Sequence, residues 1–322
     1  MQTTPEIPFS ELFLKIKSEL HKEIVGQDRL LDRLLIALLA DGHVLLEGVP
    51  GLAKTRTLMA LTKVLDAKMT RVQFTPDILP SDVVGTEVYR PQNGDFVIRK
   101  GPVFTNLLLA DEINRAPAKV QSALLQAMQE REVTIGEETF SLPTPFLVLA
   151  TQNPLEQEGT YALPEAQVDR FLMKVKLNYP TFDEEVAIIE LASSDASSNL
   201  SLSKVLPLSN LSALRAQCAE VYIDPKIDRY IVSLVHASRN GDAYGLKGMI
   251  EWGGSPRASI ALRVCARALA FLKGKQFVTP DDVKEIAPDV LRHRIIVTFE
   301  AEARGVDSDE IIKTLLAGVT VP

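Results

Sequence analysis

The sequence has few cysteines, and their surroundings argue against a covalent or metal framework. Only two are present, Cys218 and Cys265, in separate helical patterns with no cluster of His or acidic residues nearby. A metal site would need further ligands beside the cysteines, and nothing in the pattern pairs the two thiols in a disulfide. We therefore expect both cysteines to be buried, reduced thiols.

Long apolar runs and signal-like segments are also missing. The longest unbroken apolar run covers residues 34–40, well short of the roughly 20 residues that cross a bilayer. Residues 1–9 contain two prolines and no basic side chain, unlike a secretory signal. The sequence therefore predicts a cytoplasmic protein that does not insert into membranes.

The charge is modest and mixed in sign. The net charge is −7 and the pI about 5.3, and no block of five like charges occurs. Proteins that bind nucleic acids or anionic membrane surfaces usually carry patches of basic side chains. The composition therefore disfavours both kinds of partner.

The chain is long enough for two domains. It has 322 residues, 46% hydrophobic and 24% charged, enough for a sizeable core. Strand-like runs alternate with helical patterns up to about residue 178, which predicts an α/β fold with a parallel sheet sandwiched by helices. Helical patterns dominate from residue 181, so we expect domains at 1–180 and 181–322, the second all-helical. The polar segment 192–204 is the expected linker.

The individual elements follow from hydrophobic periodicity and from turn and cap residues. Strands are predicted at 43–46, 69–74, 107–110, 146–150 and 171–177. Helices are predicted at 29–40, 56–66, 116–131, 183–191, 208–221, 225–238, 256–273 and 280–290. Asp224, Ser255 and Thr279 each precede a proline and should cap the last three helices. Turns at Gly94 and Gly136 predict two β-hairpins.

The stretch EGVPGLAKT, residues 47–55, joins the first strand to a helix and predicts a phosphate-binding loop. Gly48 and Gly51 allow backbone angles closed to other residues, so several N–H groups can point at one anion. Lys54 would reach the β- and γ-phosphates, and the Thr55 hydroxyl would bind Mg²⁺.

This loop departs from the general phosphate-loop pattern at Ala53, where the pattern has glycine. Alanine is acceptable there if its φ is negative, as expected at the start of a helix. Taken alone, the loop could equally be an ordinary Gly/Pro turn. The interpretation therefore depends on the other motifs.

Two carboxylates, Asp111 and Glu112, follow the apolar strand at 107–110. Ligands of parallel sheets bind beyond the carboxyl ends of the strands, where the phosphate loop also lies. Asp111 would hold Mg²⁺ directly or through water, and Glu112 could polarise the attacking water. The alternative is that the pair only caps the following helix, but a nearby phosphate loop favours catalysis.

Three more polar side chains are candidates. Asn153 follows the strand at 146–150 and could bind the γ-phosphate or the attacking water, although Asn before Pro is often only a turn. Arg170 could pair with Asp169, or it could reach a neighbour's γ-phosphate as an arginine finger. Arg257 lies in the first turn of a helix, where a cation is mildly unfavourable, so an anionic partner such as the nucleotide is expected.

Together these motifs resemble those of the MoxR family of AAA+ ATPases. The resemblance covers nearly the whole chain, from about residue 24 to the C-terminal helices. It rests on GVPGLAKT at 48–55, LADEINR at 109–115, ATQNP at 150–154, EAQVDRF at 165–171 and SPR at 255–257. The alanine before the lysine is similar to what this family tolerates.

The resemblance implies an ATPase with ATP and Mg²⁺ as its ligands. It implies a Walker A pair in Lys54 and Thr55 and a Walker B pair in Asp111 and Glu112. It further implies that Asn153 is sensor 1, Arg170 the arginine finger and Arg257 sensor 2. Nucleotide contacts would come from Val25, Gly26, Gly48, Val49, Pro50, Gly51, Leu52, Ala53, Lys54 and Thr55. Arg115 could be an interface residue or form an ordinary ion pair, and Trp252 could be buried or exposed.

The same resemblance implies a homo-oligomer, a hexameric ring, that acts like a chaperone in maturing metalloenzymes or protein complexes. Proteins with a von Willebrand factor A domain are the expected partners. Two alternatives use the same core: a nucleic-acid-dependent motor, and a nucleotide-gated scaffold with little turnover. The acidic composition disfavours the first, and the presence of Asp111, Glu112 and Asn153 disfavours the second.

Overall fold

The centre of the fold is a five-stranded parallel sheet. The computed structural model describes residues 9–49, 52, 54–154, 160–193 and 202–322. The strand order is β2-β5-β8-β1-β9, and each neighbouring pair runs parallel. The strands are β1 (Val44–Glu47), β2 (Met69–Gln73), β5 (Leu107–Asp111), β8 (Leu147–Gln152) and β9 (Met173–Lys176). The predicted parallel sheet is confirmed.

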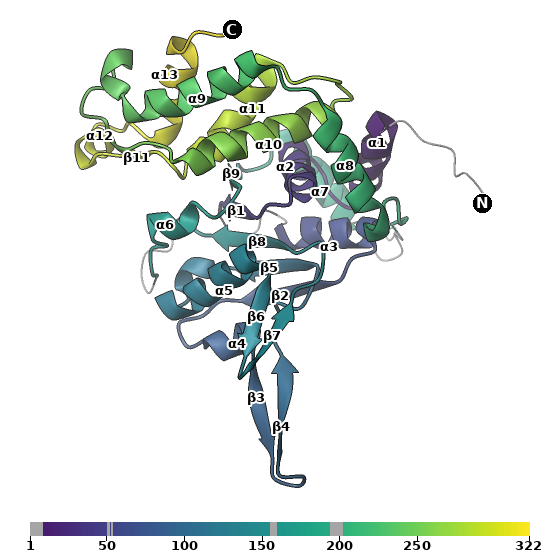
Figure 1. The fold of residues 1–322 in the computed structure, drawn as a ribbon. Coiled ribbons are helices and arrows are strands. Elements are labelled where there is room, and N and C mark those ends of the chain that lie inside the picture. Colours follow the sequence, from purple (N-terminus) through teal and green to yellow (C-terminus); the bar gives the residue numbers. More distant parts are fainter. Residues whose placement is uncertain (1–8, 50–51, 53, 155–159, 194–201) are drawn as a thin grey trace.

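Helices cover both faces of this sheet (Figure 1). In β5, Leu107 and Leu109 belong to one buried cluster, whereas Leu108 and Ala110 belong to another. A strand that is apolar on both sides must be covered on both sides, which gives the α/β sandwich. The helices of this part are α1 (Phe9–Leu20), α2 (Asp28–Leu39), α3 (Lys54–Leu65), α4 (Pro80–Val84), α5 (Ala118–Glu130), α6 (Glu165–Val168) and the 3₁₀ turn η1 (Ile113–Arg115).

Both predicted hairpins are confirmed. They are formed by β3 (Gly85–Arg90) with β4 (Asp95–Lys100) and by β6 (Glu132–Ile135) with β7 (Glu138–Ser141). Gly94 and Gly136 in their turns have φ of 70° and 62°, angles that favour glycine. The β3–β4 hairpin projects away from the body (Figure 1), and its Tyr89 and Phe96 side chains are 53% and 67% exposed.

The chain after β9 is mainly helical, and we call residues 202–322 the lid. Its helices and those leading to it are α7 (Phe182–Ser193), η3 (Leu208–Asn210), α8 (Leu211–Glu220), α9 (Pro225–Arg239), η4 (Gly241–Tyr244), α10 (Pro256–Leu272), α11 (Pro280–Leu291), α12 (Phe299–Ala303) and α13 (Ser308–Gly318). The predicted caps Asp224, Ser255 and Thr279 are confirmed. None of the helices in the described part of the chain combines the length and apolar character that crossing a bilayer needs.

The expectation of an entirely helical second domain needs one correction. β10 (Ile250–Trp252) and β11 (Ile296–Val297) form an antiparallel pair within the lid. Strands this short contain too few residues to show an alternating pattern. Trp252 lies on the lid surface, with 63% of its side chain exposed. Most of the predicted linker, residues 194–201, lies outside the described residues.

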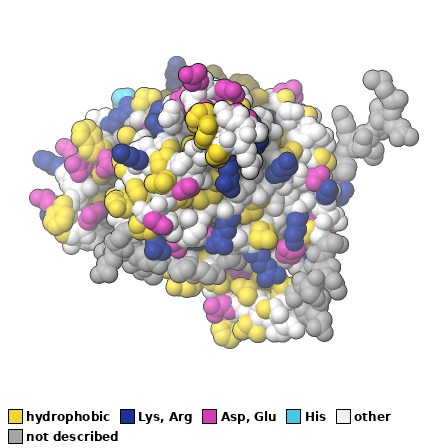
Figure 2. All heavy atoms as spheres, turned by 90° about the horizontal axis from the view of Figure 1, so that it is seen from below, with side chains coloured by type: hydrophobic (Ala, Val, Ile, Leu, Met, Phe, Trp, Pro, Cys, Tyr) yellow, Lys and Arg dark blue, Asp and Glu magenta, His cyan; other side chains and the backbone are white. Residues whose placement is uncertain are grey.

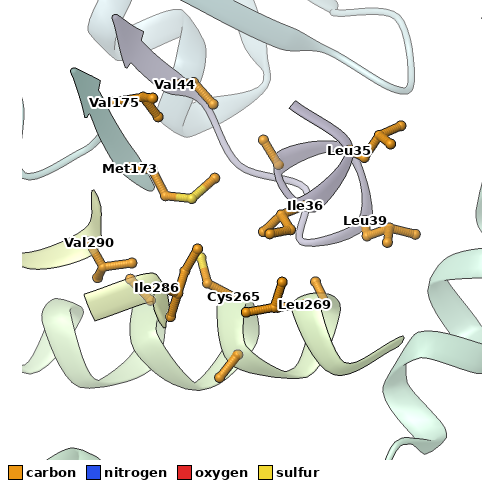
Figure 3. Packing of buried hydrophobic residues seen from close by; sticks show 14 of the residues in the cluster. Leu35, Ile36, Leu39, Val44, Met173, Val175, Cys265, Leu269, Ile286 and Val290 are labelled. Atoms are coloured by element: carbon orange, nitrogen blue, oxygen red, sulfur yellow. The ribbon is translucent and has the colours of Figure 1, made fainter. Parts of the chain in front are cut away.

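One hydrophobic cluster joins the lid to the sheet. Figure 3 shows its members from five elements: Leu35, Ile36 and Leu39 of α2, Val44 of β1, Met173 and Val175 of β9, Cys265 and Leu269 of α10, and Ile286 and Val290 of α11. Cys218 and Cys265 are free and buried, as predicted, and burial raises the pKa of Cys265 to about 12. Sheet and lid therefore share a single core.

A buried carboxylate reinforces this junction. Asp289 of α11 is fully buried and accepts hydrogen bonds from Arg29 at 2.8 Å and Arg33 at 2.7 Å, both on α2. Arg292 bonds to the same carboxylate at 2.5 Å and also donates to the Lys174 carbonyl in β9 at 2.6 Å. A buried charge is tolerated only when its partners surround it in this way.

We expect Asp289→Ala to destabilise the protein strongly. The change leaves the buried Arg33 and Arg292 without their shared carboxylate, which should cost about 3–5 kcal/mol of unfolding free energy. Urea unfolding followed by far-UV circular dichroism measures this loss. Glu11→Ala is the control, because Glu11 forms an exposed ion pair with Lys15 that should contribute less than about 1 kcal/mol. Equal losses in the two variants would contradict the role given to Asp289.

Candidate functional site

The phosphate-loop residues line a cavity at the carboxyl edge of the sheet. The loop leaves β1 at Glu47, and α3 begins at Lys54. The cavity has a volume of about 380 Å³. Its lining residues are Gly48, Leu52, Lys54, Thr55, Arg56, Arg71, Gln73, Asp111, Glu112, Thr151 and Asn153. Pro50, Gly51 and Ala53 lie outside the described residues.

The strand register explains why these side chains meet. β5 and β8 run parallel with Ala110 opposite Ala150, and β8 and β1 run parallel with Gln152 opposite Glu47. The residues that follow each strand therefore emerge at one edge of the sheet. The predicted association of Asp111, Asn153 and the phosphate loop at one edge is observed.

Lys54 is held at the floor of the cavity. Its ammonium group donates a hydrogen bond to the Gly48 carbonyl at 2.6 Å. Partial burial lowers the pKa of Lys54, while the nearby Asp111 and Glu112 carboxylates raise it. A partly desolvated ammonium beside a glycine-containing loop is suited to an anionic ligand, since its own bond to the loop is to a neutral carbonyl.

Thr151 of β8 fixes the two carboxylates relative to each other. Its hydroxyl donates to Asp111 Oδ1 at 2.8 Å and accepts from the Glu112 backbone N–H at 2.9 Å. Glu112 has φ of 56° and ψ of 50°, a left-handed conformation that is uncommon outside glycine. Strained backbone of this kind concentrates at functional sites. The bond to Thr151 helps to hold Glu112 in it.

Both carboxylates also have cationic or amide partners. Arg71 of β2 donates to Asp111 Oδ2 through NH2 at 2.7 Å and Nε at 3.0 Å. Gln73 Nε2 donates to Glu112 Oε2 at 2.8 Å. Arg115 bonds to the same Glu112 oxygen at 3.1 Å, so it forms an ion pair within this site.

Thr55 and Asp111 fit a magnesium ion. Their hydroxyl and carboxylate oxygens are hard ligands and line the same cavity. Within the described ranges, no group of three or more His, Cys, Asp and Glu side chains could hold a metal alone. Magnesium in nucleotide sites needs only one or two protein ligands, because phosphate and water oxygens complete its shell.

Sequence reasoning missed Arg71, Gln73 and the role of Thr151. Arg71 and Gln73 are two residues apart on β2, so their side chains point to the same face of the sheet. Their proximity to Asp111 depends on β2 lying next to β5, with Gln73 opposite Asp111. That neighbour relation is a property of the strand order and cannot be read from the local pattern.

The turn containing Val25 and Gly26, which the resemblance implies as a nucleotide contact and where we expect the base to bind, does not line this cavity. Val25, Gly26 and Val49 are absent from its lining residues. Gly26 has φ of 64°, and a Cβ there would collide with the Glu184 carboxylate of α7. Gly48 similarly packs against Leu177, so residues 177–184, from the end of β9 into α7, contact both turns. A contact between this turn and the base stays a prediction.

Arg170 and Arg257 lie in a second cavity, of about 420 Å³, at the opposite edge of the sheet. Gly42 and His43, which immediately precede β1, also line it. The Leu172 N–H donates to the His43 carbonyl at 2.8 Å, so Arg170 precedes the amino end of β9. β1 has four residues, which separate the two edges by about 13 Å at about 3.3 Å per residue.

Asp169 pairs with residues other than Arg170. It accepts from Arg294 Nε at 2.7 Å and from Ser255 Oγ at 3.1 Å, and Arg257 NH1 lies 3.6 Å away. The anionic partner expected for Arg257 is therefore Asp169 within this chain. The predicted alternative of an Asp169–Arg170 pair is not formed among the described residues, where Arg170 Nε is buried without a hydrogen-bond partner.

His43 in this second cavity has a structural role. Its Nδ1 accepts from the Val148 N–H at 2.9 Å, and Nε2 lies 3.1 Å from the Met128 carbonyl. This pattern needs the neutral ring with its proton on Nε2. Burial and then the charge of Arg131 lower the pKa of His43 to about 3. The imidazole ties the start of β1 to β8 and α5.

Two family models match the chain. A model described as the ATPase family associated with various cellular activities (AAA) matches residues 43–173. A model of the AAA lid domain matches residues 244–315. The first match contains the phosphate loop, both carboxylates, Asn153 and Arg170, and the second contains Arg257.

Similar proteins match over almost their whole length. Chaperone MoxR1 of Mycobacterium tuberculosis is 46% identical, over 94% of this chain and 81% of its own. The uncharacterized protein YeaC of Bacillus subtilis is 42% identical, over 96% of this chain and 94% of its own. The crystal structure of a Cytophaga hutchinsonii protein assigned as an ATPase has 47% identity and a TM-score of 0.91, and covers 98% of this chain and 96% of its own.

The low pKa of His43 predicts acid sensitivity. The unfolded ring takes up a proton near pH 6.5, while the folded ring does so only at about pH 3. The contribution of the neutral His43 ring to the free energy of unfolding is therefore fully present above pH 6.5. It is lost as the pH decreases towards 3, by about 2 kcal/mol between pH 7 and pH 5. Urea unfolding at both pH values should show a smaller loss for His43→Gln than for the wild type. His21→Gln, at a partly exposed position, is the control and should retain the wild-type loss.

Proposed function

Because the chain belongs to the MoxR family of AAA+ ATPases, we propose that it hydrolyses Mg²⁺-bound ATP and uses the cycle to remodel protein partners. The observation that carries this proposal is the cavity at the carboxyl edge of the sheet. It combines the phosphate-loop residues Lys54 and Thr55 with the carboxylates Asp111 and Glu112. Each of these residue types is needed for phosphoryl transfer to water.

The proposed roles follow from position and chemistry. Lys54 binds the β- and γ-phosphates, exchanging its bond to the Gly48 carbonyl for bonds to anionic oxygens. Thr55 and Asp111 hold Mg²⁺, which neutralises phosphate charge. Glu112, fixed through Thr151, orients the attacking water and accepts its proton. Asn153, which also lines the cavity, orients the γ-phosphate or the water.

The arginines complete the site of a neighbouring subunit in this proposal. Arg170 and Arg257 lie together at the amino edge, away from the Lys54 cavity of their own chain. Head-to-tail packing of subunits would bring this edge against the next subunit's phosphate loop. Both arginines would then stabilise charge at the neighbour's γ-phosphate. We propose that this head-to-tail packing closes into a ring of six subunits.

The proposed activity on partners is that of a chaperone, as the name of the M. tuberculosis relative states for that protein. The clients would be metalloenzymes or other complexes that need maturation, and a protein with a von Willebrand factor A domain would take part. Binding measurements with such domains, in the presence of ATP and of ADP, test this part separately from hydrolysis.

The nucleic-acid alternative has weaker support. Figure 2 looks onto the side to which the β3–β4 hairpin points, and shows hydrophobic, basic and acidic side chains interspersed there. A nucleic-acid groove would collect positive charge along a path for the phosphates. Strong stimulation of ATP hydrolysis by DNA or RNA would favour this alternative over a protein client.

Two substitutions should separate binding from chemistry. Lys54→Ala removes the cation for the phosphates, so binding of a fluorescent ATP analogue should weaken at least about tenfold. Glu112→Gln keeps the shape and should bind ATP, but should hydrolyse it at least about 100-fold more slowly, because the amide cannot accept a proton. Unchanged turnover of Glu112→Gln would refute its assignment as the general base.

Mixing experiments test the shared site. Arg170→Ala and Arg257→Ala should each bind ATP normally and hydrolyse it poorly, because each lacks a cation for its neighbour. Mixing either with Lys54→Ala should restore some activity at junctions that combine an intact phosphate loop with intact arginines. Wild-type activity per subunit should also rise with protein concentration until the ring is complete. No recovery in rings that mass spectrometry shows to be mixed would exclude action between subunits.

A further inference from the structure

The guanidinium of Arg71 forms an ion pair with the Asp111 carboxylate. We propose that Arg71 is a positioning residue that competes with Mg²⁺ for the Asp111 carboxylate and links the arrival of the metal to the release of Glu112. This inference rests on the proposed function, because it requires Asp111 to be a magnesium ligand.

The contact geometry makes Arg71 and a metal direct competitors. Both Nε and NH2 of Arg71 bond to the same oxygen, Asp111 Oδ2. The other oxygen, Oδ1, accepts the Thr151 hydroxyl bond at 2.8 Å. Two charge-assisted bonds to Oδ2 occupy the lone pairs that a metal would use there. Mg²⁺ can bind Oδ2 only if the guanidinium moves, and at the remaining lone pair of Oδ1 it would lie close to the guanidinium charge, so Arg71 opposes magnesium binding in either position.

A second contact of Arg71 extends its influence to Glu112. Arg71 NH2 donates to Gln73 Oε1 at 3.3 Å, and Gln73 Nε2 donates to Glu112 Oε2 at 2.8 Å. An amide has one acceptor end and one donor end, so the guanidinium fixes which end faces Glu112. When Arg71 leaves Asp111, Gln73 loses this constraint. Glu112 Oε2 then retains its bond from Arg115, and the attacking water can replace the Gln73 amide more easily.

The exposure of the pair allows such an exchange. The Arg71 side chain is 52% exposed, whereas that of Asp111 is 14% exposed. Surface ion pairs are weak, so this pair should raise the magnesium concentration needed for binding by only about threefold to fivefold. A fully buried ion pair would be harder for Mg²⁺ to displace. Without any ion pair, the adjacent carboxylates of Asp111 and Glu112 would have less positive charge beside them.

Nucleotide binding at varied magnesium concentration tests the proposal without relying on turnover. The probe is a fluorescent ADP analogue, and the readout is the Mg²⁺ concentration that gives half of the maximal gain in affinity. Arg71→Ala should lower that concentration about threefold to fivefold relative to its control. The control is Arg56→Ala, which removes the same charge from the same cavity without touching the bonds to Asp111.

A second variant tests whether the charge of Arg71 alone, without its bonding geometry, accounts for the change in magnesium requirement. Arg71→Lys keeps the charge but cannot bond to Asp111 and Gln73 through one planar group. Its magnesium requirement should fall between those of wild type and Arg71→Ala, and circular dichroism should show all variants folded. Equal magnesium requirements in Arg71→Ala and Arg56→Ala would overturn this inference alone. A wild-type protein that binds no nucleotide would overturn the proposed function as well.

Discussion

The fully buried Asp289 carboxylate constrains how the lid packs on the sheet. Three arginines surround it, Arg29 and Arg33 from α2 and Arg292 from the end of its own helix. Leaving this buried charge unpaired would cost several kcal/mol of unfolding free energy. α11 is therefore stable against α2 and β9 only in the position that pairs Asp289 with these arginines. The shared hydrophobic cluster fills the same junction. Lid and sheet are therefore packed against each other through one hydrophobic cluster and one buried ion-pair network.

This packing bears on the distribution of the candidate site residues. Lys54, Thr55, Asp111, Glu112 and Asn153 occupy the carboxyl edge of the sheet, and Arg170 and Arg257 occupy the amino edge. The length of the strands separates the two groups, and the lid that carries Arg257 packs on the same sheet. If these residues act on one nucleotide, they must come from two copies of the chain. Motion during the cycle would then be expected between subunits.

Local patterns in the sequence predicted the elements and the strand ends that carry Lys54, Asp111 and Asn153, because apolar runs and the polar residues after them are local features. Partners that depend on strand order could not be predicted in this way. The contacts of Arg71 and Gln73 need β2 beside β5, and the contact of Asp169 with Arg294 joins residues far apart in the chain. The β10–β11 pair was missed because its strands are too short for an alternating pattern.

Asp169 and Arg170 show how adjacent residues can serve different purposes at the amino edge. Asp169 has a structural role, because Arg294, Ser255 and Arg257 all contact its carboxylate. Arg170 is kept out of that network and retains a buried Nε without a partner in the described part of the chain. Asp169 also contacts the start of α10 through Ser255 and Arg257, which keeps Arg257 at the amino edge beside Arg170. Because both arginines line one cavity, an anion that enters it would lie near both guanidinium groups, as the proposed shared site requires.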